Sequence, residues 1–207
     1  MYVAVSGNIG AGKSTLTRIL ADRYQLLPVY ETVDENPYLE DFYRDRRSFA
    51  FHSQVFFLSK RLEQHLQLVN GTDRVIQDRT IYEDAAVFAT ALHQEGSLDE
   101  RDYGSYLALY SAITKALRPP DLLIYLRARL PTLQKRIRLR GRSYEHSIHD
   151  AYLHRLNDLY DRWIEEFDLA KVITIPTDHL DLVANQQDLD TALSMLEAHG
   201  LTPPILR

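Results

Sequence analysis

The sequence predicts an α/β fold in which five parallel strands form one sheet flanked by helices. Two observations support this fold class. Five short apolar runs recur along the chain, at residues 2–6, 26–30, 74–77, 121–126 and 172–175. Segments in which apolar residues have helical spacing separate these runs. Because strands that alternate with helices are joined by right-handed crossovers, the pattern indicates a parallel sheet.

The composition is that of an ordinary globular domain. Of the 207 residues, 45% are hydrophobic and 26% charged, so we expect residues 1–207 to form a single domain with its own core. The net charge of −5 gives no reason to expect a nucleic acid partner. There is no cysteine, no recognisable signal peptide and no apolar run near the ~20 residues that span a bilayer. We therefore expect a cytoplasmic protein without a membrane partner.

The first strand runs into a glycine-rich loop that matches the phosphate-binding pattern G-x-x-x-x-G-K-S. Glycines let the backbone turn its N–H groups around an anion, and the helix that follows adds further donors. Lys13 is expected to reach the β- and γ-phosphates, and the Ser14 hydroxyl to ligate Mg²⁺. The sequence therefore predicts that a nucleoside triphosphate binds to Gly7, Asn8, Ile9, Gly10, Ala11, Gly12, Lys13, Ser14 and Thr15.

The second and third strands end at charged residues. Glu31 follows the second strand, and Asp78 and Arg79 follow the third. Ligands of a parallel sheet sit beyond the carboxyl ends of its strands, so these groups are expected to meet near the γ-phosphate. One carboxylate can accept a hydroxyl proton, another can hold Mg²⁺, and an arginine can neutralise the transferring group. The alternatives are that Glu31 begins a solvated acidic loop and that Asp78 caps the next helix.

Two helical segments carry polar residues that could read a heterocyclic base. Residues 51–69 show an apolar stripe that faces the core or a partner, and Gln54 and Arg61 share one face of this helix. In the next helix Asp84 and Phe88 are four residues apart, so a carboxylate could pair with the edge of a base while a ring stacks on its face. Helical spacing alone favours the plainer interpretation: a solvated polar flank, a surface acid and a core phenylalanine.

The fourth strand leads to a helix rich in arginine. Like charges four residues apart destabilise a helix, and a bound anion would relieve the repulsion. We expect a lid over a triphosphate at about residues 136–148, in which Gly141 offers a point where the lid can bend. The arginines concerned are Arg136, Arg138, Arg140 and Arg142.

With these motifs in place, the chain resembles the deoxynucleoside kinase family from its first strand to its last, and within it the bacterial deoxyadenosine and deoxyadenosine/deoxyguanosine kinases. Order and spacing together carry the resemblance. Beyond the phosphate loop it depends on Glu31…Glu35-Asn36-Pro37-Tyr38-Leu39…Phe42-Tyr43, on Gln54…Arg61, on Asp78-Arg79-Thr80-Ile81-Tyr82-Glu83-Asp84, and on Arg136…Arg140-Gly141-Arg142-Ser143…Glu145.

The resemblance implies a P-loop kinase fold with an arginine-rich lid, ATP and Mg²⁺ as donor and metal, and a homodimer formed through a helix bundle. It makes Glu31 the general base, with Arg79 beside it, and assigns Tyr43 and Glu145 to the deoxyribose 3′-hydroxyl. Asp78 helps to place Mg²⁺. The residues implied at the base are Gln54, Arg61, Asp84 and Phe88, and those implied at the donor nucleotide are Arg136, Arg140, Arg142 and Asp178.

Two positions depart from the family pattern. Tyr144 stands where members commonly have an acid, which puts in doubt a second lid carboxylate. Asn36 lies where many eukaryotic members have a tryptophan, and the Asn-Pro-Tyr form is shared with the bacterial purine kinases.

The sequence thus predicts transfer of the γ-phosphate of ATP to the 5′-hydroxyl of a purine deoxynucleoside in nucleotide salvage. Deoxyadenosine is favoured, and deoxyguanosine and deoxycytidine stay open as acceptors. A nucleoside monophosphate kinase of the thymidylate kinase type is the first alternative, because it shares the loop and an arginine lid. The second is a regulatory nucleotide-binding module; the guanine-reading Asn-Lys-x-Asp motif of a GTPase switch does not occur in the chain.

Overall fold

The computed structural model describes residues 1–142, 144–145 and 148–201, without the side chain of Asp34. Ser143 and residues 146–147, which belong to the predicted lid, lie outside the described residues, as do residues 202–207.

The predicted parallel sheet is confirmed within the described residues. Its strands are β1 (Tyr2–Gly7), β2 (Leu27–Val29), β3 (Val75–Asp78), β4 (Leu122–Arg127) and β5 (Lys171–Pro176). They are ordered β2-β3-β1-β4-β5, and every paired neighbour is parallel. The chain therefore enters the sheet at its centre, and the glycine-rich loop leaves from the middle of the carboxyl edge.

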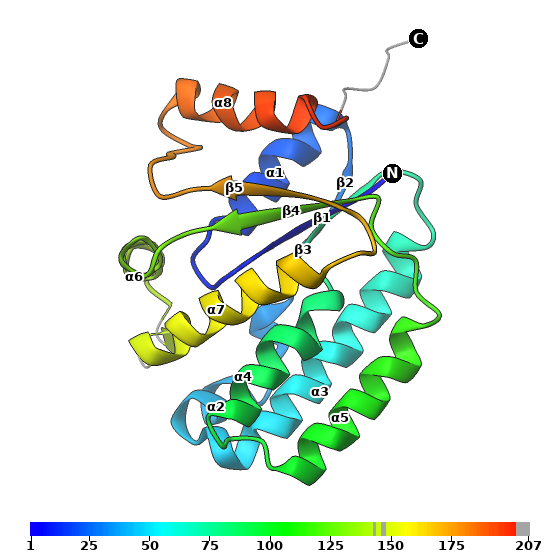
Figure 1. Cartoon of the computed structure of the whole chain (residues 1–207), viewed down its shortest axis with the longest axis vertical. Helices are drawn as coiled ribbons and strands as arrows, with labels where there is room; N and C mark the ends of the chain where they lie inside the picture. Colours follow the sequence, from blue (N-terminus) through cyan, green and yellow to red (C-terminus); the bar gives the residue numbers. More distant parts are fainter. Residues whose placement is uncertain (143, 146–147, 202–207) are drawn as a thin grey trace.

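Helices cover both faces of the sheet (Figure 1). α1 (Lys13–Tyr24) and α8 (Gln186–Glu197) lie on one face, while the opposite face carries most of the others. The remaining helical segments are η1 (Val33–Glu35), α2 (Leu39–Arg44), α3 (Arg46–Gln64), η2 (His65–Val69), η3 (Asp84–Ala89), α4 (Thr90–Gln94), α5 (Glu100–Thr114), α6 (Leu130–Arg140) and α7 (Asp150–Glu166). None of the described helices is long and apolar enough to cross a membrane.

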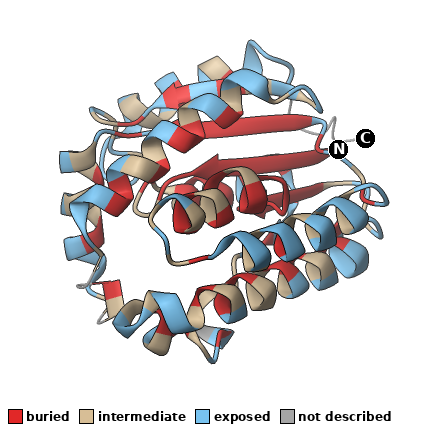
Figure 2. Ribbon diagram, turned by 60° about the horizontal axis from the view of Figure 1, so that its bottom comes forward, coloured by how far each residue is buried: buried red, intermediate tan, exposed pale blue. Residues whose placement is uncertain are grey.

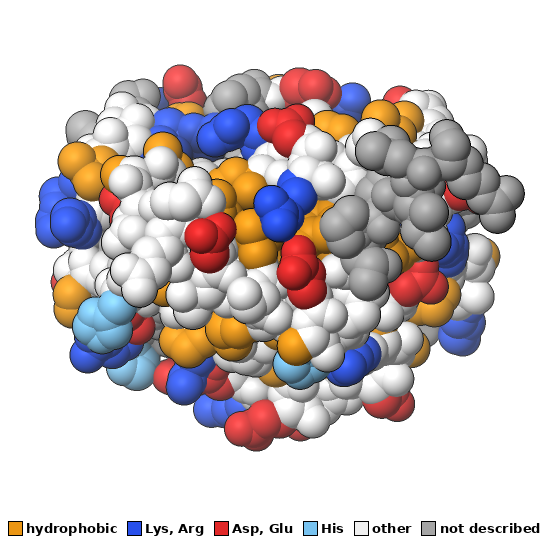
Figure 3. Space-filling view, turned by 90° about the horizontal axis from the view of Figure 1, so that it is seen from above, with side chains coloured by type: hydrophobic (Ala, Val, Ile, Leu, Met, Phe, Trp, Pro, Cys, Tyr) orange, Lys and Arg blue, Asp and Glu red, His pale blue; other side chains and the backbone are white. Residues whose placement is uncertain are grey.

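Strand β1 contributes to two separate cores. Tyr2 and Ala4 pack into the cluster formed with α3, α5 and α7, whereas Val3 and Val5 pack into the cluster formed with α1 and α8. Successive side chains of a strand point to opposite faces, so a central parallel strand must be apolar on both. Figure 2 shows the result: the central strands are buried along their length between exposed outer helix surfaces. On the face seen in Figure 3, acidic and basic side chains are interspersed.

The helix predicted over residues 51–69 begins earlier than expected and changes its pitch. Asp45 starts α3, because its side chain accepts a hydrogen bond from the Ser48 backbone N–H at 3.2 Å. From His65 to Val69 the turns widen into the π-helical segment η2. An additional residue per turn rotates the side chains that follow, so Leu66 of the predicted apolar stripe is 52% exposed, whereas Val69 is buried.

Gly7 shows how tightly the loop is fitted against the sheet. Its φ is +147°, and a Cβ there would lie 2.6 Å from the Leu126 carbonyl oxygen. We expect Gly7→Ala to lower the free energy of unfolding by about 1–3 kcal/mol, measured by denaturant titration. Gly104→Ala is the matched control: Gly104 is exposed in the middle of α5 with open space around it, so alanine should raise stability by about 0.5–1 kcal/mol. Equal effects of the two changes would contradict this account.

Candidate active site

Two adjoining cavities open along the carboxyl edge of the sheet. The inner cavity is lined by groups from the ends of β2 and β3, from α3 and from the segment after α6. The outer cavity, of about 840 Å³, lies between the glycine-rich loop, α6 and the segment after β5. Lys13, Ser14, Arg140 and Arg142 line both, so a molecule in one cavity would adjoin a molecule in the other.

The structure brings the predicted site residues to these two cavities. Those that line the inner cavity are Ile9, Lys13, Ser14, Glu31, Tyr43, Gln54, Arg61, Asp78, Arg79, Asp84, Phe88, Arg140, Arg142 and Glu145. Those that line the outer cavity are Gly10, Ala11, Gly12, Lys13, Ser14, Thr15, Arg136, Arg140, Arg142 and Asp178. Gly7 ends β1, and Asn8 is buried in the loop that follows.

The loop that carries Lys13 is fixed from the far side by α7. The Asn8 side-chain amide donates to the Leu153 carbonyl at 2.9 Å and to Asn157 Oδ1 at 2.7 Å. Lys13 turns back over the loop, where its Nζ donates to the Asn8 carbonyl at 3.1 Å. Burial, together with the charge of Arg79, lowers the pKa of Lys13 to about 8. A buried ammonium with so few partners is well placed to attract an anion.

Two arginines form ion pairs with Glu31, and the register of the sheet explains the first of them. Val29 pairs with Gln77, so two residues further on Glu31 meets Arg79, whose Nε lies 2.9 Å from Glu31 Oε1. Arg61 reaches the same oxygen from α3, at 2.6 Å. Burial alone would raise the pKa of Glu31, but the positive charges of Arg79, Arg61 and Lys13 outweigh burial and lower it to about 2. The predicted alternative, a solvated acidic loop, is therefore wrong for this residue.

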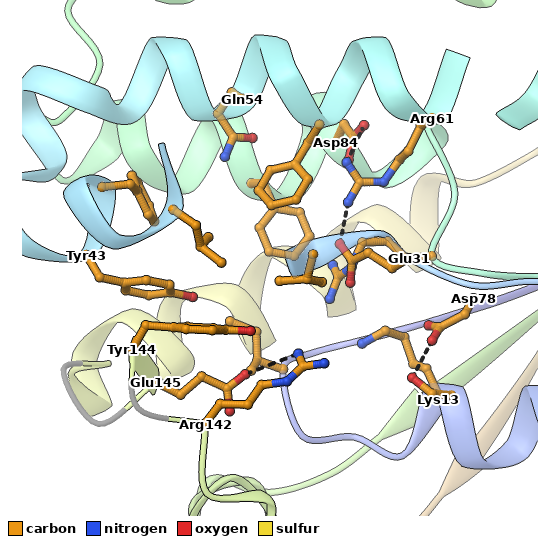
Figure 4. Close-up of a pocket in the computed structure, with 18 of the residues that line it drawn as sticks. Lys13, Glu31, Tyr43, Gln54, Arg61, Asp78, Asp84, Arg142, Tyr144 and Glu145 are labelled. Carbon is orange, nitrogen blue, oxygen red and sulfur yellow. Dashed lines mark hydrogen bonds and ion pairs between the residues drawn. The ribbon is translucent and has the colours of Figure 1, made fainter. Parts of the chain in front are cut away.

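The second oxygen of Glu31 faces the inner cavity. Both arginines contact Oε1, and in the described part of the chain Oε2 accepts no hydrogen bond. Figure 4 shows the Glu31 carboxylate below Arg61, directed toward the space enclosed by the cavity side chains. An ionised carboxylate with one oxygen anchored and one open can accept a hydrogen bond from a hydroxyl group.

Arg79 is held by two residues, Tyr160 and Glu83, to which the sequence analysis assigned no role. Its backbone adopts φ +66°, in the left-handed region, and its Nη1 donates to the Tyr160 hydroxyl at 2.9 Å. Tyr160 in turn donates to Glu83 Oε2 at 2.7 Å, and the Arg79 guanidinium lies 4.4 Å from the centre of the Phe88 ring. Glu83 lies inside the stretch quoted from the sequence but without a role, and Tyr160 is distant in the chain. Together they fix the orientation of Arg79.

Asp78 does not cap the helix that follows, so this predicted alternative is wrong. The Thr80 N–H is satisfied by Glu83 Oε1 at 2.9 Å, while Asp78 Oδ2 accepts a hydrogen bond from the Ser14 hydroxyl. Burial raises the pKa of Asp78, and its Oδ1 is buried without a hydrogen-bond partner among the described residues. An orphaned carboxylate oxygen beside a hydroxyl is a donor set that suits Mg²⁺.

The candidate base-reading residues are buried around the inner cavity. Gln54, Arg61 and Asp84 are 5%, 6% and 1% exposed, so the interpretation of a solvated flank and a surface acid is wrong. Asp84 Oδ1 lies 3.0 Å from Arg61 Nη1. Burial raises the pKa of Asp84 to about 7, against the opposing charge of Arg61. The partly buried Phe88 ring faces Arg79 and meets the Tyr160 ring edge-on at 6.1 Å.

The far end of the inner cavity combines an aromatic stack with a buried acid. The Tyr43 and Tyr144 rings stack with centroids 5.7 Å apart and planes inclined by 19°, as Figure 4 shows. Glu145 is 5% exposed and accepts hydrogen bonds from Arg140 Nε and Nη2 at 3.1 and 2.5 Å. Arg142 Nη1 lies 3.7 Å from the same carboxylate. Tyr144, the departure noted in the sequence, is thus part of the cavity wall.

Two groups predicted at the donor nucleotide have partners within the protein. Arg136 donates to the carbonyls of Ala11, Thr177 and Leu180 at 3.0, 2.7 and 3.2 Å, and so joins the glycine-rich loop to the segment after β5. Asp178 accepts from the Arg129 N–H at 2.9 Å. Both residues line the outer cavity, where they shape its wall.

Comparison with known proteins identifies the family. A family model of deoxynucleoside kinases matches residues 3–199. The chain belongs to the deoxynucleoside kinase family. It is therefore a kinase with ATP as its phosphoryl donor.

Relatives of this kinase differ in the acceptor that they are named for. It is 34% identical over 196 residues to the deoxyadenosine/deoxycytidine kinase of Bacillus subtilis. The aligned region covers 94% of this kinase and 90% of the relative. It is 35% identical over 204 residues to a deoxyguanosine kinase of Lactobacillus johnsonii, and this aligned region covers 95% of this kinase and 91% of the relative. A solved deoxyadenosine kinase from M. mycoides with dCMP and dCDP superposes with a TM-score of 0.85 at 30% identity, over 96% of this kinase and 100% of that chain. The P-loop kinase fold is thereby confirmed.

Proposed function

We propose that this kinase phosphorylates the 5′-hydroxyl of purine deoxynucleosides, with deoxyadenosine as its preferred acceptor. The observation that carries the proposal is the clamped Glu31 carboxylate, whose open oxygen lies between the phosphate loop and the buried Gln54, Arg61 and Asp84. Asp84 and Gln54 can together meet the donors and acceptors along a purine edge. Relatives named for deoxyadenosine, deoxyguanosine and deoxycytidine support a deoxynucleoside acceptor.

In the proposed reaction Glu31 accepts the hydroxyl proton. The acceptor 5′-oxygen forms a bond to the γ-phosphorus as the bond from that phosphorus to the β,γ-bridging oxygen breaks, and ADP leaves with the bonding electron pair. The transition state is loose, so orientation and charge neutralisation by Lys13 and Arg79 contribute most. Since the proton leaves late in such a reaction, Glu31 orients the hydroxyl as much as it deprotonates it.

We propose Ser14 and Asp78 as the protein groups that hold Mg²⁺. The orphaned Asp78 Oδ1 supports this assignment. Within the described residues no group of three or more His, Cys, Asp or Glu could hold a metal, which suits an ion that takes its other ligands from phosphates and water. When bound, Mg²⁺ supplies charge neutralisation for the phosphates.

We further propose that residues 1–207 act as one domain, with residues 136–148 as a lid whose Arg136, Arg140 and Arg142 approach the donor phosphates.

We also propose that the kinase works as a homodimer in cytoplasmic nucleotide salvage. The exposed apolar side chains of Leu66 and Leu109, 52% and 42% accessible, support an interface on the outer helices. Sedimentation equilibrium tests the dimer, and a monomer at micromolar concentration would contradict it.

An acceptor panel tests the proposed function. Deoxyadenosine, deoxyguanosine, deoxycytidine, thymidine, adenosine and deoxyadenosine monophosphate are offered with labelled ATP. We expect the highest kcat/KM with deoxyadenosine and little use of adenosine or of the monophosphate. Use of thymidine alone would overturn the purine assignment, and use of the monophosphate alone would indicate a nucleoside monophosphate kinase.

Tyr43 offers a test of the sugar end. We propose that Tyr43 and Glu145 hold the 3′-hydroxyl, so Tyr43→Phe should lower kcat/KM for deoxyadenosine by about 10-fold, the value of one hydrogen bond to a charged or buried partner. The same substitution should change kcat/KM for 2′,3′-dideoxyadenosine little, because that acceptor has no 3′-hydroxyl to lose. An equal loss on both acceptors would contradict this role, because the substitution keeps the ring that stacks on Tyr144 and removes only the hydroxyl.

A further inference from the structure

Arg61 lies where the base-reading end of the inner cavity meets the catalytic carboxylate. Its Nη2 donates to Glu31 Oε1 at 2.6 Å, and its Nη1 donates to Asp84 Oδ2 at 3.2 Å (Figure 4). The side chain is 7% exposed, and its Nε is buried without a partner among the described residues. One planar guanidinium thus joins a group assigned to the base and a group assigned to the chemistry.

We propose that Arg61 is a positioning residue for Glu31, so that recognition of the base and activation of the 5′-hydroxyl depend on one guanidinium. The inference rests on the proposed function of this site. A residue that only read the base would have no need to contact Glu31, and Gln54 has no such contact in the described structure. The rigid fork of a guanidinium is suited to transmit orientation from one carboxylate to another.

The free space in the inner cavity adds a second argument. It amounts to about 100 Å³, below the ~300–1,000 Å³ of typical ligand pockets, so an incoming base has to displace side chains that now contact each other. Asp84 and Arg61 are among these side chains. A base that satisfies both leaves Arg61 directed at Glu31, whereas a base that does not draws the guanidinium away. A base that does not fit then lowers kcat as well as raising KM.

The charges around Glu31 give the inference a pH signature. Removal of Arg61 takes away one of the positive charges that keep the pKa of Glu31 low, so the pH below which Glu31 is protonated moves upward. Loss of Arg61 also raises the pKa of Asp84, so the acid limb that follows Glu31 to higher pH is that of kcat/KM on an acceptor without a base, where Asp84 has nothing to read. The charged and titratable groups that face Glu31 from the surrounding elements are Lys13, Arg61, Asp78, Arg79, Asp84 and Tyr160.

The decisive experiment uses an acceptor without a base. The abasic sugar 1,2-dideoxyribose keeps the 5′-hydroxyl and the 3′-hydroxyl, and is compared with deoxyadenosine in the full-length parent, in Arg61→Met and in Gln54→Met. We expect Arg61→Met to lower kcat on the abasic sugar by about 10- to 100-fold, as expected for a misplaced reacting group. Gln54→Met, which gives the same side chain at a base-reading position, should lose far more on deoxyadenosine than on the abasic sugar.

The pH dependence separates positioning from a structural role. On the abasic sugar, where Asp84 has no base to read, we expect the acid limb of kcat/KM to shift upward in Arg61→Met and to stay at the position of the parent in Gln54→Met. Titration of the Glu31 carboxyl carbon by NMR with ¹³C-labelled glutamate reads the same shift without turnover. If Arg61→Met retains parental kcat on the abasic sugar, or if its acid limb does not move, the inference is wrong.

Failure of this inference can be distinguished from failure of the proposed function. If the parent does not phosphorylate deoxyadenosine, the proposed function fails; if it does, and Arg61 variants lose only affinity for the base, the inference alone fails. Should Arg61→Met not fold, Arg61→Lys carries the kcat test on the abasic sugar. Lysine keeps the buried charge, but its single ammonium cannot hold two carboxylates in a fixed orientation. Parental kcat on the abasic sugar in Arg61→Lys would overturn the proposal.

Discussion

Replacing Glu31 by glutamine is expected to lower kcat for deoxyadenosine by about 10²- to 10⁴-fold, the range for loss of a positioned acid–base group. Glutamine has nearly the same shape as glutamate but cannot accept the hydroxyl proton. It also leaves Arg61 and Arg79 without their shared anion, at 2.6 and 2.9 Å. Binding of ATP should persist, because the phosphate loop does not contact Glu31 Oε1. Turnover is measured under saturating substrates, and ATP affinity by calorimetry.

Glu35 supplies the matched control for this substitution. It lies four residues further along, is exposed, and pairs with Lys60 at 3.1 Å. Glu35→Gln therefore removes the same charge from the same segment without touching either cavity, and we expect parental turnover. Turnover of Glu31→Gln near the parental value would contradict the role of Glu31. A loss of ATP binding in Glu31→Gln would instead indicate that the carboxylate supports the phosphate loop.

The low pKa of Glu31 predicts how the activity of the parent enzyme depends on pH. At about 2, this pKa keeps the carboxylate ionised at neutral and mildly acidic pH, and protonation removes the base only as the pH falls toward that value. Activity lost between about pH 7 and pH 5 should therefore come from other groups, and Asp84, with a pKa raised to about 7, is the first to consider. An acid limb near neutral pH that persists in Asp84→Asn would contradict this order of titration.

Sequence alone placed the strand ends correctly because the pattern there is local. Apolar runs mark the strands, and parallel strands bring their carboxyl ends to one edge, so Glu31 and Arg79 were expected at the same edge. The sequence left a solvated loop open for Glu31, and the adjacency of β2 and β3 brings the two side chains into contact. The glycine-rich loop could also be predicted, because glycine is the residue that readily adopts the positive φ values that such a loop needs. Gly7, Gly10 and Gly12 all have positive φ in the structure.

Burial of polar side chains could not be predicted in the same way. Gln54 and Arg61 share a face of α3 whether that face meets water or a cavity, and the periodicity is the same in both cases. The outcome depends on how α3 packs against η3, which brings Asp84 to within 3.0 Å of Arg61. Only the resemblance to a family assigned these residues to the site. The contacts of Tyr160 with Arg79 and Glu83 had no signal, because Tyr160 is 81 and 77 residues away from them in the chain.

That network leads to the second large effect, expected for Arg79→Lys. We expect kcat to fall by about 10²- to 10³-fold, as for loss of one preorganised donor at a developing charge. Both side chains are cationic and bear the same cost at φ +66°, so the comparison isolates the guanidinium. Arginine contacts Glu31, the Tyr160 hydroxyl and the face of Phe88 at once. A lysine ammonium is a single point and can keep only one of these contacts.

Tyr160→Phe shows whether the orientation of Arg79 matters or only its presence. Without the hydroxyl, Arg79 Nη1 and Glu83 Oε2 lose a partner in a buried setting, at a cost of about 1–3 kcal/mol in the free energy of unfolding. If orientation matters, single-turnover rates should also fall, by about 10-fold, with KM for ATP little changed. Lower stability at the parental rate would mean that Tyr160 and Glu83 serve the core alone. The rate loss in Arg79→Lys would then be due to the guanidinium donors themselves, because their orientation would not depend on the tyrosine.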